Sequence, residues 1–357
     1  MATFNFVQNG YAGEVLEDLL THTAQGNDTY KNGLIHVHPG IQHKLTLPTV
    51  QLGSIIQDNV ATPAAPSGNT VSATSQGQYT ITERFLEPQD FMVYVEFNPR
   101  DFEKYWKFAQ PQGPLVFRSL NPKVQATMLR QLIENKNAYI GDAIWLSAKT
   151  ATKAKLTSPN GQLELGANDS FGSLGYFDGA IARLCKNIAA TAAKAPEEVA
   201  GGQAILAGST ALSTGQAVEN ALYAMWTACP KQIRNNPNLT FVTSWDVWDL
   251  YDQYLTSKDV KYSDNTKVND YRFKGKRIIP IVGMPENTII LGVFSTGRDS
   301  NLWMGIDYAN DQEAVKIDRL QNNSELYFFQ MRMKMDVNIV KPKEIVAWTN
   351  YSYSYGA

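Results

Sequence analysis

The sequence lacks several features that mark common classes of protein. It has no apolar run of roughly 18 residues, which a membrane-spanning helix would need, and its start shows no secretory signal pattern. Only two cysteines occur among 357 residues, Cys185 and Cys229, so a disulfide framework is excluded and buried thiols are expected. The net charge of −2 argues against a dedicated nucleic-acid-binding protein, which usually carries a basic excess.

Charged residues are also scarce. They make up 18% of the chain, against about 25% in an average soluble domain. Apolar residues make up 43%, which is enough for a substantial core. A low charge content is typical of a surface that is partly buried against other chains.

Motifs for catalysis are missing as well. The sequence has no nucleophile elbow, Walker loop or dinucleotide fingerprint, so no catalytic residue and no cofactor is expected. The four histidines, His22, His36, His38 and His43, all lie near the N-terminus. On a strand, His36 and His38 would point to the same side and could begin a metal site, but Pro39 and Gly40 turn the chain before His43. We therefore expect no metal and keep a metal-dependent enzyme as an alternative of another class.

The first hundred residues predict parts that cannot fold alone. Residues 1–40 resemble an arm with a short amphipathic helix at 13–24. Residues 41–97 predict two long strands, 43–56 and 79–97, with the second broken near Pro88. The tract between the strands is rich in small and turn-forming residues and is too long for a tight hairpin. Such a ribbon must pack on its own chain or on a neighbour.

The clearest helix signal covers 122–147. Asn121 is a good N-cap and Pro122 suits the first helical position. Apolar residues recur at helical spacing, although one step spans a full heptad: Val124, Met128, Leu132, Tyr139, Ala143 and Leu146. Shorter helices are predicted at 99–110, 176–193 and 214–229, and Ser244 is expected to cap a further helix.

The second half predicts mainly strands. A Gly/Ala/Ser-rich stretch at 195–215 indicates a domain boundary. Strands are expected at 239–243, 271–282, 288–293, 302–306, 314–317, 329–339 and 344–349. Strict alternation over 329–339 predicts a strand with one solvated face, long enough for an elongated subunit.

The order of these parts resembles the Hong Kong 97 fold, the fold of tailed-phage major capsid proteins and encapsulins. The local resemblance is closest over 239–306. There a strand ends at a small polar residue that begins a Trp-containing helix, and a glycine, an apolar strand, a Met-Pro turn and another strand follow: Phe241-Val242-Thr243-Ser244-Trp245, Phe273, Gly275, Ile278–Val282, Met284-Pro285 and Thr288–Gly292. Farther on, the strand at 329–339, Pro342 and Ile345-Val346 fit the end of the family pattern.

The resemblance implies an α+β fold divided into five parts. These are an N-terminal arm at 1–40, an extended loop at 41–97, a peripheral domain at 98–204 with a spine helix at 122–147, an axial domain at 205–320, and return strands of the peripheral domain at 321–357.

The resemblance also implies a structural function. The expected protein is a non-enzymatic major capsid protein that forms hexamers and pentamers of an icosahedral shell around phage double-stranded DNA. Its location would be the virion capsid, assembled in the cytoplasm of the host bacterium. Expected partners are other copies, a portal protein, packaged DNA, and possible separate scaffolding and decoration proteins, but no membrane. An encapsulin-type cargo compartment is the alternative within the same fold. Lys44 lies at the base of the loop, which argues against a Lys–Asn crosslink.

Two groups of residues are candidates for function. Exposed apolar side chains of the arm and loop would contact neighbouring subunits: Phe4, Phe6, Ile55, Ile56 and Phe85. Basic residues along the spine helix would face DNA, unless they merely solvate the helix surface: Lys123, Arg130 and Lys136.

Overall fold

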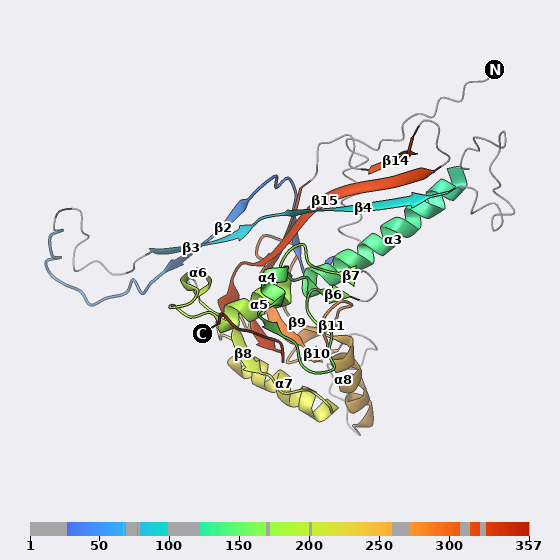
Figure 1. Ribbon diagram of the computed structural model, residues 1–357. Coiled ribbons are helices and arrows are strands. Elements are labelled where there is room, and N and C mark those ends of the chain that lie inside the picture. The colour runs from blue at the N-terminus through green and yellow to red at the C-terminus, as the bar shows by residue number, and fades with distance from the viewer. Residues whose placement is uncertain are drawn as a thin grey trace, which may run out of the picture.

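The computed structural model describes most of the chain. The described residues are 27–66, 68, 77, 79–98, 122–168, 172–199, 202–258, 271–307, 315–321 and 326–356. They form an α+β structure with a central body and a two-stranded ribbon that projects from it (Figure 1). The predicted helices at 13–24 and 99–110 lie outside the described residues.

The spine of the body is α3, Pro122–Leu146. It is 25 residues long and agrees closely with the predicted helix at 122–147. Figure 1 shows α3 beside the long strands β4 (Gln89–Phe97) and β15 (Tyr327–Ile339). The C-terminal turns of α3 are the most deeply buried, and Ile140, Ile144 and Trp145 are almost inaccessible to solvent.

A five-stranded sheet is built around β15. The strand order is β1 (His36–His38), β13 (Leu302–Asp307), β15 and β14 (Val315–Arg319), and β4 pairs with the opposite edge of β15. Burial alternates along the first part of β15, as its sequence predicts, because Met331 and Met333 face the core while Arg332 is exposed. The predicted strand at 329–339 is thus confirmed and begins two residues earlier.

A six-stranded sheet forms the other part of the body. Its order is β10 (Arg272–Phe273), β11 (Lys276–Pro280), β9 (Leu239–Thr243), β12 (Ile289–Val293), β16 (Val346–Trp348) and β8 (Ile205–Gly208). Every residue of β9 and β12 is buried, which explains why β12 is a continuous apolar run; β9 also buries Thr240 and Thr243.

Two cores lie on opposite faces of this sheet. One face packs against α7 (Gly215–Ala228) and α8 (Trp245–Ser257). On the other face, Val242 and Ile290 join a core that also contains residues of α3, β13 and β15. This second core therefore lies between the two sheets and contains residues of both.

The remaining elements are short. They are α2 (Asp28–Lys31), α4 (Thr150–Lys153), α5 (Ala180–Ala189), α6 (Pro196–Val199), a 3₁₀ turn at Pro342–Glu344, and the paired strands β5 (Leu156–Thr157) with β17 (Ser352–Tyr353) and β6 (Ala167–Asn168) with β7 (Gly172–Ser173). Helix α5 is shorter than the predicted helix at 176–193.

One predicted helix cap has a different role. Ser244 occupies the N-cap position of α8, but its side chain makes no capping hydrogen bond. The hydroxyl instead donates to the carbonyl oxygen of Thr288, 3.4 Å away, and so connects the end of β9 to the start of β12. The position of the helix start was predicted correctly, but the partner of the hydroxyl was not.

Strand pairing crosses the predicted domain boundaries. Strand β13 falls within the predicted axial domain at 205–320, yet it pairs with β15. Strand β16 falls within the predicted return strands at 321–357, yet it lies between β12 and β8. The junction at 195–215 contains β8, so it is not only a linker.

Residues 27–40 belong to the body. Leu34 and Ile35 are buried in the larger core, and the indole of Trp145 donates to the Thr29 hydroxyl at 3.0 Å. The part of the predicted arm at 1–26 lies outside the described residues. An arm, if present, therefore does not include 27–40.

The ribbon consists of β2 (Leu45–Leu52) and β3 (Tyr79–Leu86), which pair in antiparallel register. Strand β3 ends at Leu86, and Glu87 and Pro88 separate it from β4, as predicted near Pro88. Strand β2 ends at Leu52, four residues before the predicted end, and residues 53–66 form neither helix nor strand.

Candidate assembly surfaces

The two faces of the ribbon differ in polarity. Residues directly opposite each other on antiparallel strands share a face, and Val50 pairs with Ile81 while Leu52 pairs with Tyr79. These four side chains therefore lie on one face, and they are 58%, 63%, 45% and 71% exposed, respectively. On the opposite face, Thr49 pairs with Thr82. The ribbon thus exposes an apolar stripe that nothing in the described part of the chain covers.

The base of the ribbon is held by hydrogen bonds to β15. The side-chain amide of Asn338 donates to the carbonyl oxygen of Phe85 at 2.7 Å. The backbone N–H of Glu87 donates to the Asp336 carboxylate at 2.8 Å. Because both bonds involve backbone groups of the ribbon, they fix the point at which it leaves the body.

An ion pair adds a third attachment. The Arg84 guanidinium donates to the carboxylate of Glu198 and to its carbonyl oxygen, both at 3.0 Å. The Arg84 side chain is only 11% exposed, and its burial lowers its pKa while Glu198 opposes that shift. Helix α6 thereby holds β3 from the side opposite to the stripe.

Asp336 is the most buried charge in this attachment. Its side chain is 2% exposed and lies 2.7 Å from the Arg183 guanidinium. Burial raises the pKa of Asp336, and Arg183 and the Glu87 N–H counteract that rise. The carboxylate thus joins α5, β15 and the ribbon in a single network.

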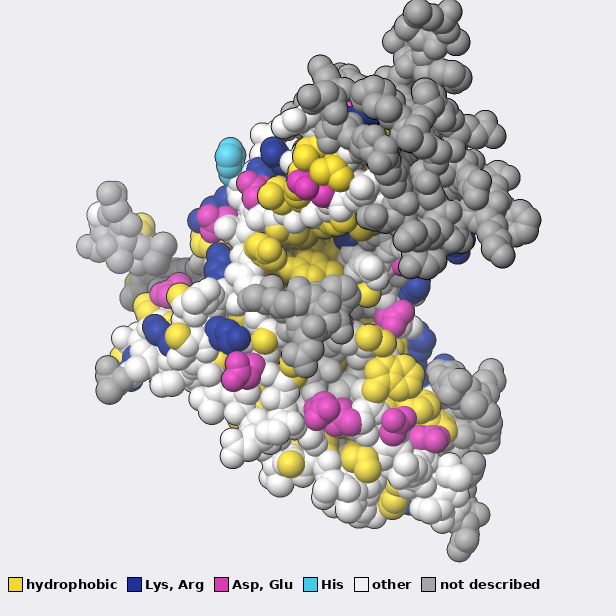
Figure 2. Space-filling view, turned by 45° about the vertical axis from the view of Figure 1, so that its right-hand side comes forward, with side chains coloured by type: hydrophobic (Ala, Val, Ile, Leu, Met, Phe, Trp, Pro, Cys, Tyr) yellow, Lys and Arg dark blue, Asp and Glu magenta, His cyan; other side chains and the backbone are white. Residues whose placement is uncertain are grey.

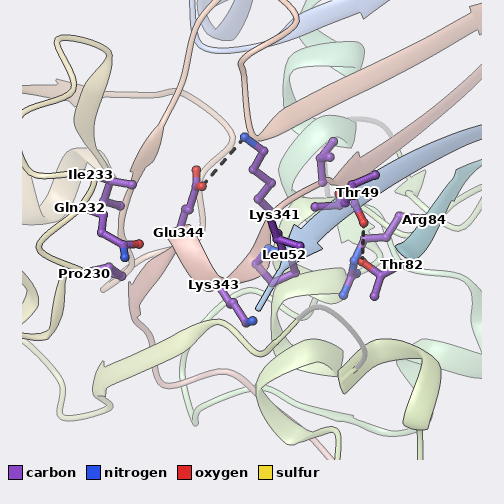
Figure 3. A pocket seen from close by; sticks show the side chains of 13 residues that line it. Thr49, Leu52, Thr82, Arg84, Pro230, Gln232, Ile233, Lys341, Lys343 and Glu344 are labelled. Atoms are coloured by element: carbon purple, nitrogen blue, oxygen red, sulfur yellow. Dashed lines mark hydrogen bonds and ion pairs between the residues drawn. The ribbon is translucent and has the colours of Figure 1, made fainter. Parts of the chain in front are cut away.

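A groove of about 580 Å³ lies between the ribbon and the body (Figure 3). Thr49, Leu52, Thr82 and Arg84 line the ribbon side, and the turn at 230–233 lines the other side. Residues 340–344 form the floor, where Lys341 lies 3.9 Å from Glu344. We call this the ribbon groove.

Three of the candidate contact residues are described. Ile55 and Ile56 are 60% and 86% exposed, just beyond the end of β2. Phe85 is 37% exposed at the ribbon base, with the Lys44 ammonium 3.5 Å from its ring centre. Phe4 and Phe6 lie outside the described residues. The role of all five in subunit contacts stays a prediction.

Sequence reasoning missed the apolar stripe. Its residues were assigned to the strands, but no face was assigned to a neighbour. The signal was available, because Val50 and Leu52 alternate with Thr49 and Gln51 in the sequence. Only the register with β3 shows that Ile81 and Tyr79 extend the same face.

The three basic residues suggested to face DNA do not form one surface. Arg130 is exposed and pairs with Glu134 at 3.1 Å, and the side chain of Lys123 lies outside the description. Lys136 is wrong as a DNA contact, because it is 5% exposed and its ammonium lies 2.9 Å from the Met331 sulfur. Burial lowers its pKa to about 7. Acidic and basic side chains are also interspersed on the face in Figure 2.

The three described histidines are not grouped as metal ligands. The His36 ring lies 2.6 Å from the Thr296 carbonyl oxygen and packs against Trp303, and His38 lies on the same strand. Burial and the neighbouring His36 lower the pKa of His38. His43 is exposed after the turn, and His22 is outside the described residues. Within the described ranges, no three His, Cys, Asp or Glu side chains are grouped to hold a metal ion.

Among the described residues, no helix is both long enough and apolar enough to cross a bilayer.

Comparisons by sequence give no relative. No protein-family model matches the chain, and no curated protein matches it significantly.

Comparisons by structure give several similar chains. One comes from the procapsid of satellite phage P4, with a TM-score of 0.54 and 10% identity, covering 95% of this chain and 92% of that one. A second comes from the capsid of a native GTA particle, with a TM-score of 0.52, 11% identity, and coverage of 92% and 90%. A third comes from the capsid of cyanophage A-1(L), with a TM-score of 0.51, 14% identity, and coverage of 90% and 92%.

The chain has a phage capsid fold. The expected Hong Kong 97-like α+β fold is thereby confirmed, because the likeness extends over at least 90% of this chain in each of the three structures. At 10–14% identity, the likeness concerns the fold and does not assign the role of any residue.

Proposed function

We propose that the protein is the major capsid subunit of a tailed bacteriophage. It would form hexamers and pentamers of an icosahedral shell that encloses double-stranded DNA. The observation that carries this proposal is the apolar stripe of the ribbon, which extends from a subunit with a capsid fold. Burial of such a stripe on a neighbour would stabilise the assembly by about 25 cal/mol per Å², before the cost of association.

The proposed function is structural and includes no reaction. Other copies of the chain are the main partners. A portal protein, a separate scaffolding protein, decoration proteins and non-specifically bound DNA are proposed as further partners. The proposed location is the virion capsid, after assembly in the cytoplasm of the bacterial host.

Electron microscopy of the purified full-length protein tests the proposal. Uniform closed shells, tubes or ring-shaped capsomers are expected. A protein that stays a stable monomer at all concentrations, with and without crowding agents, would contradict it.

A compartment shell for protein cargo is the alternative within the same architecture. Particles isolated from their native source distinguish the two, because a phage shell holds nuclease-protected double-stranded DNA. A packaged enzyme without DNA would favour the compartment.

A further inference from the structure

Basic residues gather on the short hairpin formed by β10 and β11. The segment 272–277 reads Arg-Phe-Lys-Gly-Lys-Arg, with four cations among six residues and no acid. Strand β10 is an edge of the six-stranded sheet, and Arg272, Lys274 and Arg277 are exposed. The net charge of −2 is an average over the whole chain, whereas this segment, which we call the basic hairpin, is locally positive.

Three cations of the basic hairpin lack a counter-charge. Lys274, Lys276 and Arg277 form no ion pair with any described residue. Lys276 donates to the carbonyl oxygen of Asn236 at 2.8 Å, which satisfies a hydrogen bond but does not neutralise the charge. Arg272 takes part in a further interaction and is not counted here. Partly buried cations elsewhere in the body lie 2.6–3.0 Å from a carboxylate: Arg183, Lys186 and Lys258.

The hairpin also has two features that oppose its own folding. Its two-residue turn consists of Lys274 and Gly275, with φ angles of 52° and 75°. Such a turn favours Asn-Gly or Gly-Gly, because a lysine is strained at positive φ. Arg272 lies directly opposite Arg277 in the strand register, and like charges in such a pair repel. A role in folding therefore does not account for the choice of these residues.

Tyr223 of α7 adds a polar aromatic side chain to the same surface. It is 43% exposed, and its ring packs edge-on against Phe273 with 4.8 Å between the ring centres. The Lys274 ammonium lies 5.1 Å from the centre of the Tyr223 ring. The Tyr223 hydroxyl has no hydrogen-bond partner among the described residues. Hydroxyl and ammonium groups are the donors that proteins use to contact phosphate oxygens.

We propose that the basic hairpin binds the phosphate backbone of double-stranded DNA, independently of base sequence. DNA carries one negative charge per about 1.7 Å of its axis, so cations a few residues apart can each reach a phosphate. The phosphates would supply the counter-charge that Lys274, Lys276 and Arg277 lack. This inference rests on the proposed function, because it names the surface with which a shell would contact the DNA that it encloses.

An acidic surface of another protein chain has less support as the partner. Acidic side chains on the face in Figure 2 are scattered and form no patch that would match the basic hairpin. Two acids of α8 are already engaged within the subunit. Asp246 accepts a hydrogen bond from the N–H of Asn287, and Asp252 accepts one from the Tyr271 hydroxyl.

Fluorescence anisotropy with a short labelled duplex tests the proposal. The full-length protein is kept below its critical concentration for assembly, and salt is varied between about 50 and 200 mM. The K274Q/R277Q variant should bind about fivefold more weakly at the lower salt concentration. The slope of log affinity against log salt should fall by about 1 for each phosphate contact removed.

K31Q/K155Q is the matched control for this variant. It also removes two positive charges from exposed positions, but both lie outside the basic hairpin. Its affinity for the duplex should stay close to that of the parent. Equal affinities of the two variants, or a parent protein that does not bind the duplex, would overturn the proposal.

Lys274→Asn separates DNA binding from folding. Asparagine suits the positive φ of this turn better than lysine, so the midpoint of urea unfolding should stay the same or rise. The affinity for DNA should nevertheless fall by about threefold, because one phosphate contact is lost. A lower midpoint with unchanged affinity would show that Lys274 serves folding and would contradict the proposal.

Particles with and without DNA give a second, independent measurement. Acetylation of accessible amines followed by mass spectrometry compares the reactivity of Lys274 and Lys276 in the two kinds of particle. Several-fold lower reactivity is expected in the DNA-filled particles. Equal reactivity in both would place the basic hairpin away from the DNA and overturn the assignment.

Microscopy of the same variants separates this inference from the proposed function. Normal shells from K274Q/R277Q, together with weaker DNA binding, support the proposal. Loss of shells with unchanged DNA affinity would make the basic hairpin a contact between subunits and overturn it. Hairpin-dependent DNA binding in a protein that never forms particles supports the hairpin assignment and counts against the shell function.

Discussion

The base and the outer half of the ribbon are built on opposite principles. At the base, Leu47 and Leu86 are buried, and the polar groups of the network have partners on β15 and α6. In the outer half, Val50 and Ile81 face solvent. Because a two-stranded ribbon cannot bury its own faces, the base is stabilised by its own subunit, while we propose that the outer half is buried by another chain. Substitutions at the base should therefore affect folding, and substitutions farther out should affect assembly.

The largest expected loss of folding stability comes from Asp336→Ala. Removing one partner of a buried ion pair leaves the other charge uncompensated and typically costs about 3–5 kcal/mol. Arg183 is 23% exposed, so we expect the lower part of that range for the free energy of unfolding. Urea unfolding of the unassembled subunit measures it.

Asp90→Ala is the matched control for this change. Asp90 is 79% exposed and lies 3.7 Å from Lys334, so its loss should change the free energy of unfolding by less than about 0.5 kcal/mol. An equally small effect of Asp336→Ala would mean that the base is not held by this network.

Lys136→Met examines an ammonium group that is buried against β15 and has no acidic partner among the described residues. Burial lowers the lysine pKa from 10.5 to about 7, which corresponds to a penalty on the order of 5 kcal/mol for the charged form. The variant should therefore be more stable than the parent at pH 6, by an amount approaching this penalty. Such a gain would show that the buried Lys136 ammonium beside Met331 of β15 destabilises the subunit, unlike the ion-paired residues at the ribbon base.

The pH dependence has a definite sign. Below pH 7 the lysine is protonated in both states, and the penalty is fully present. Between pH 7 and 10.5 the unfolded state binds more protons, so the stability contributed by this group rises with pH. The advantage of Lys136→Met in the free energy of unfolding should therefore shrink from pH 6 to pH 9.5. A constant advantage would exclude titration of Lys136.

Arg84→Gln should have a smaller effect on folding. The variant removes charge-assisted hydrogen bonds to Glu198, which are typically worth about 1.5–3 kcal/mol. Partial exposure of Glu198 places the expected loss near the lower value. The free energy of unfolding is again the measurement, and Arg130→Gln, at an exposed position of α3, is the control. A neutral result would mean that α6 does not hold the ribbon.

The smallest effect on folding is expected for the double variant Ile55→Ser and Ile56→Ser. Both side chains are largely exposed, so the free energy of unfolding should change by less than about 0.5 kcal/mol. Burying one such side chain at an interface is worth about 1.5–3 kcal/mol. The critical concentration for assembly should therefore rise by at least about tenfold, as measured by light scattering.

The adjacent polar pair provides the control for assembly. Gln57→Ser with Asp58→Ser alters two exposed residues without removing apolar surface. Normal assembly of both double variants would exclude Ile55 and Ile56 from the subunit contacts.

Periodicity predicted the elements well because it depends only on neighbouring residues. The helix at α3 and the long strand β15 were predicted from spacing, and the structure places them within two residues of the expected bounds. The burial of Lys136 was missed, although the heptad step between Leu132 and Tyr139 marked an absent apolar position. Lys136 occupies that position on the apolar side of the helix. A charged residue was assumed to be solvated, but the facing strand excludes water.

Partners of strands could not be predicted in the same way. Alternation shows which side of a strand is buried, but it does not say which strand lies beside it. The pairing of β16 with β8 therefore could not be predicted from the sequence, nor could the hydrogen bond from Asn338 to the ribbon backbone. The ribbon groove was missed for the same reason, since it is formed by four separated segments.

The position of β16 has a consequence for the order in which the subunit is made. Strand β8 is synthesised well before its neighbour in the sheet, β16, which lies close to the end of the described chain. During translation, β8 and one edge of β12 therefore stay unpaired until β16 has emerged from the ribosome. A polypeptide that ends before Val346 cannot complete the six-stranded sheet, because the strand between β12 and β8 is missing from it.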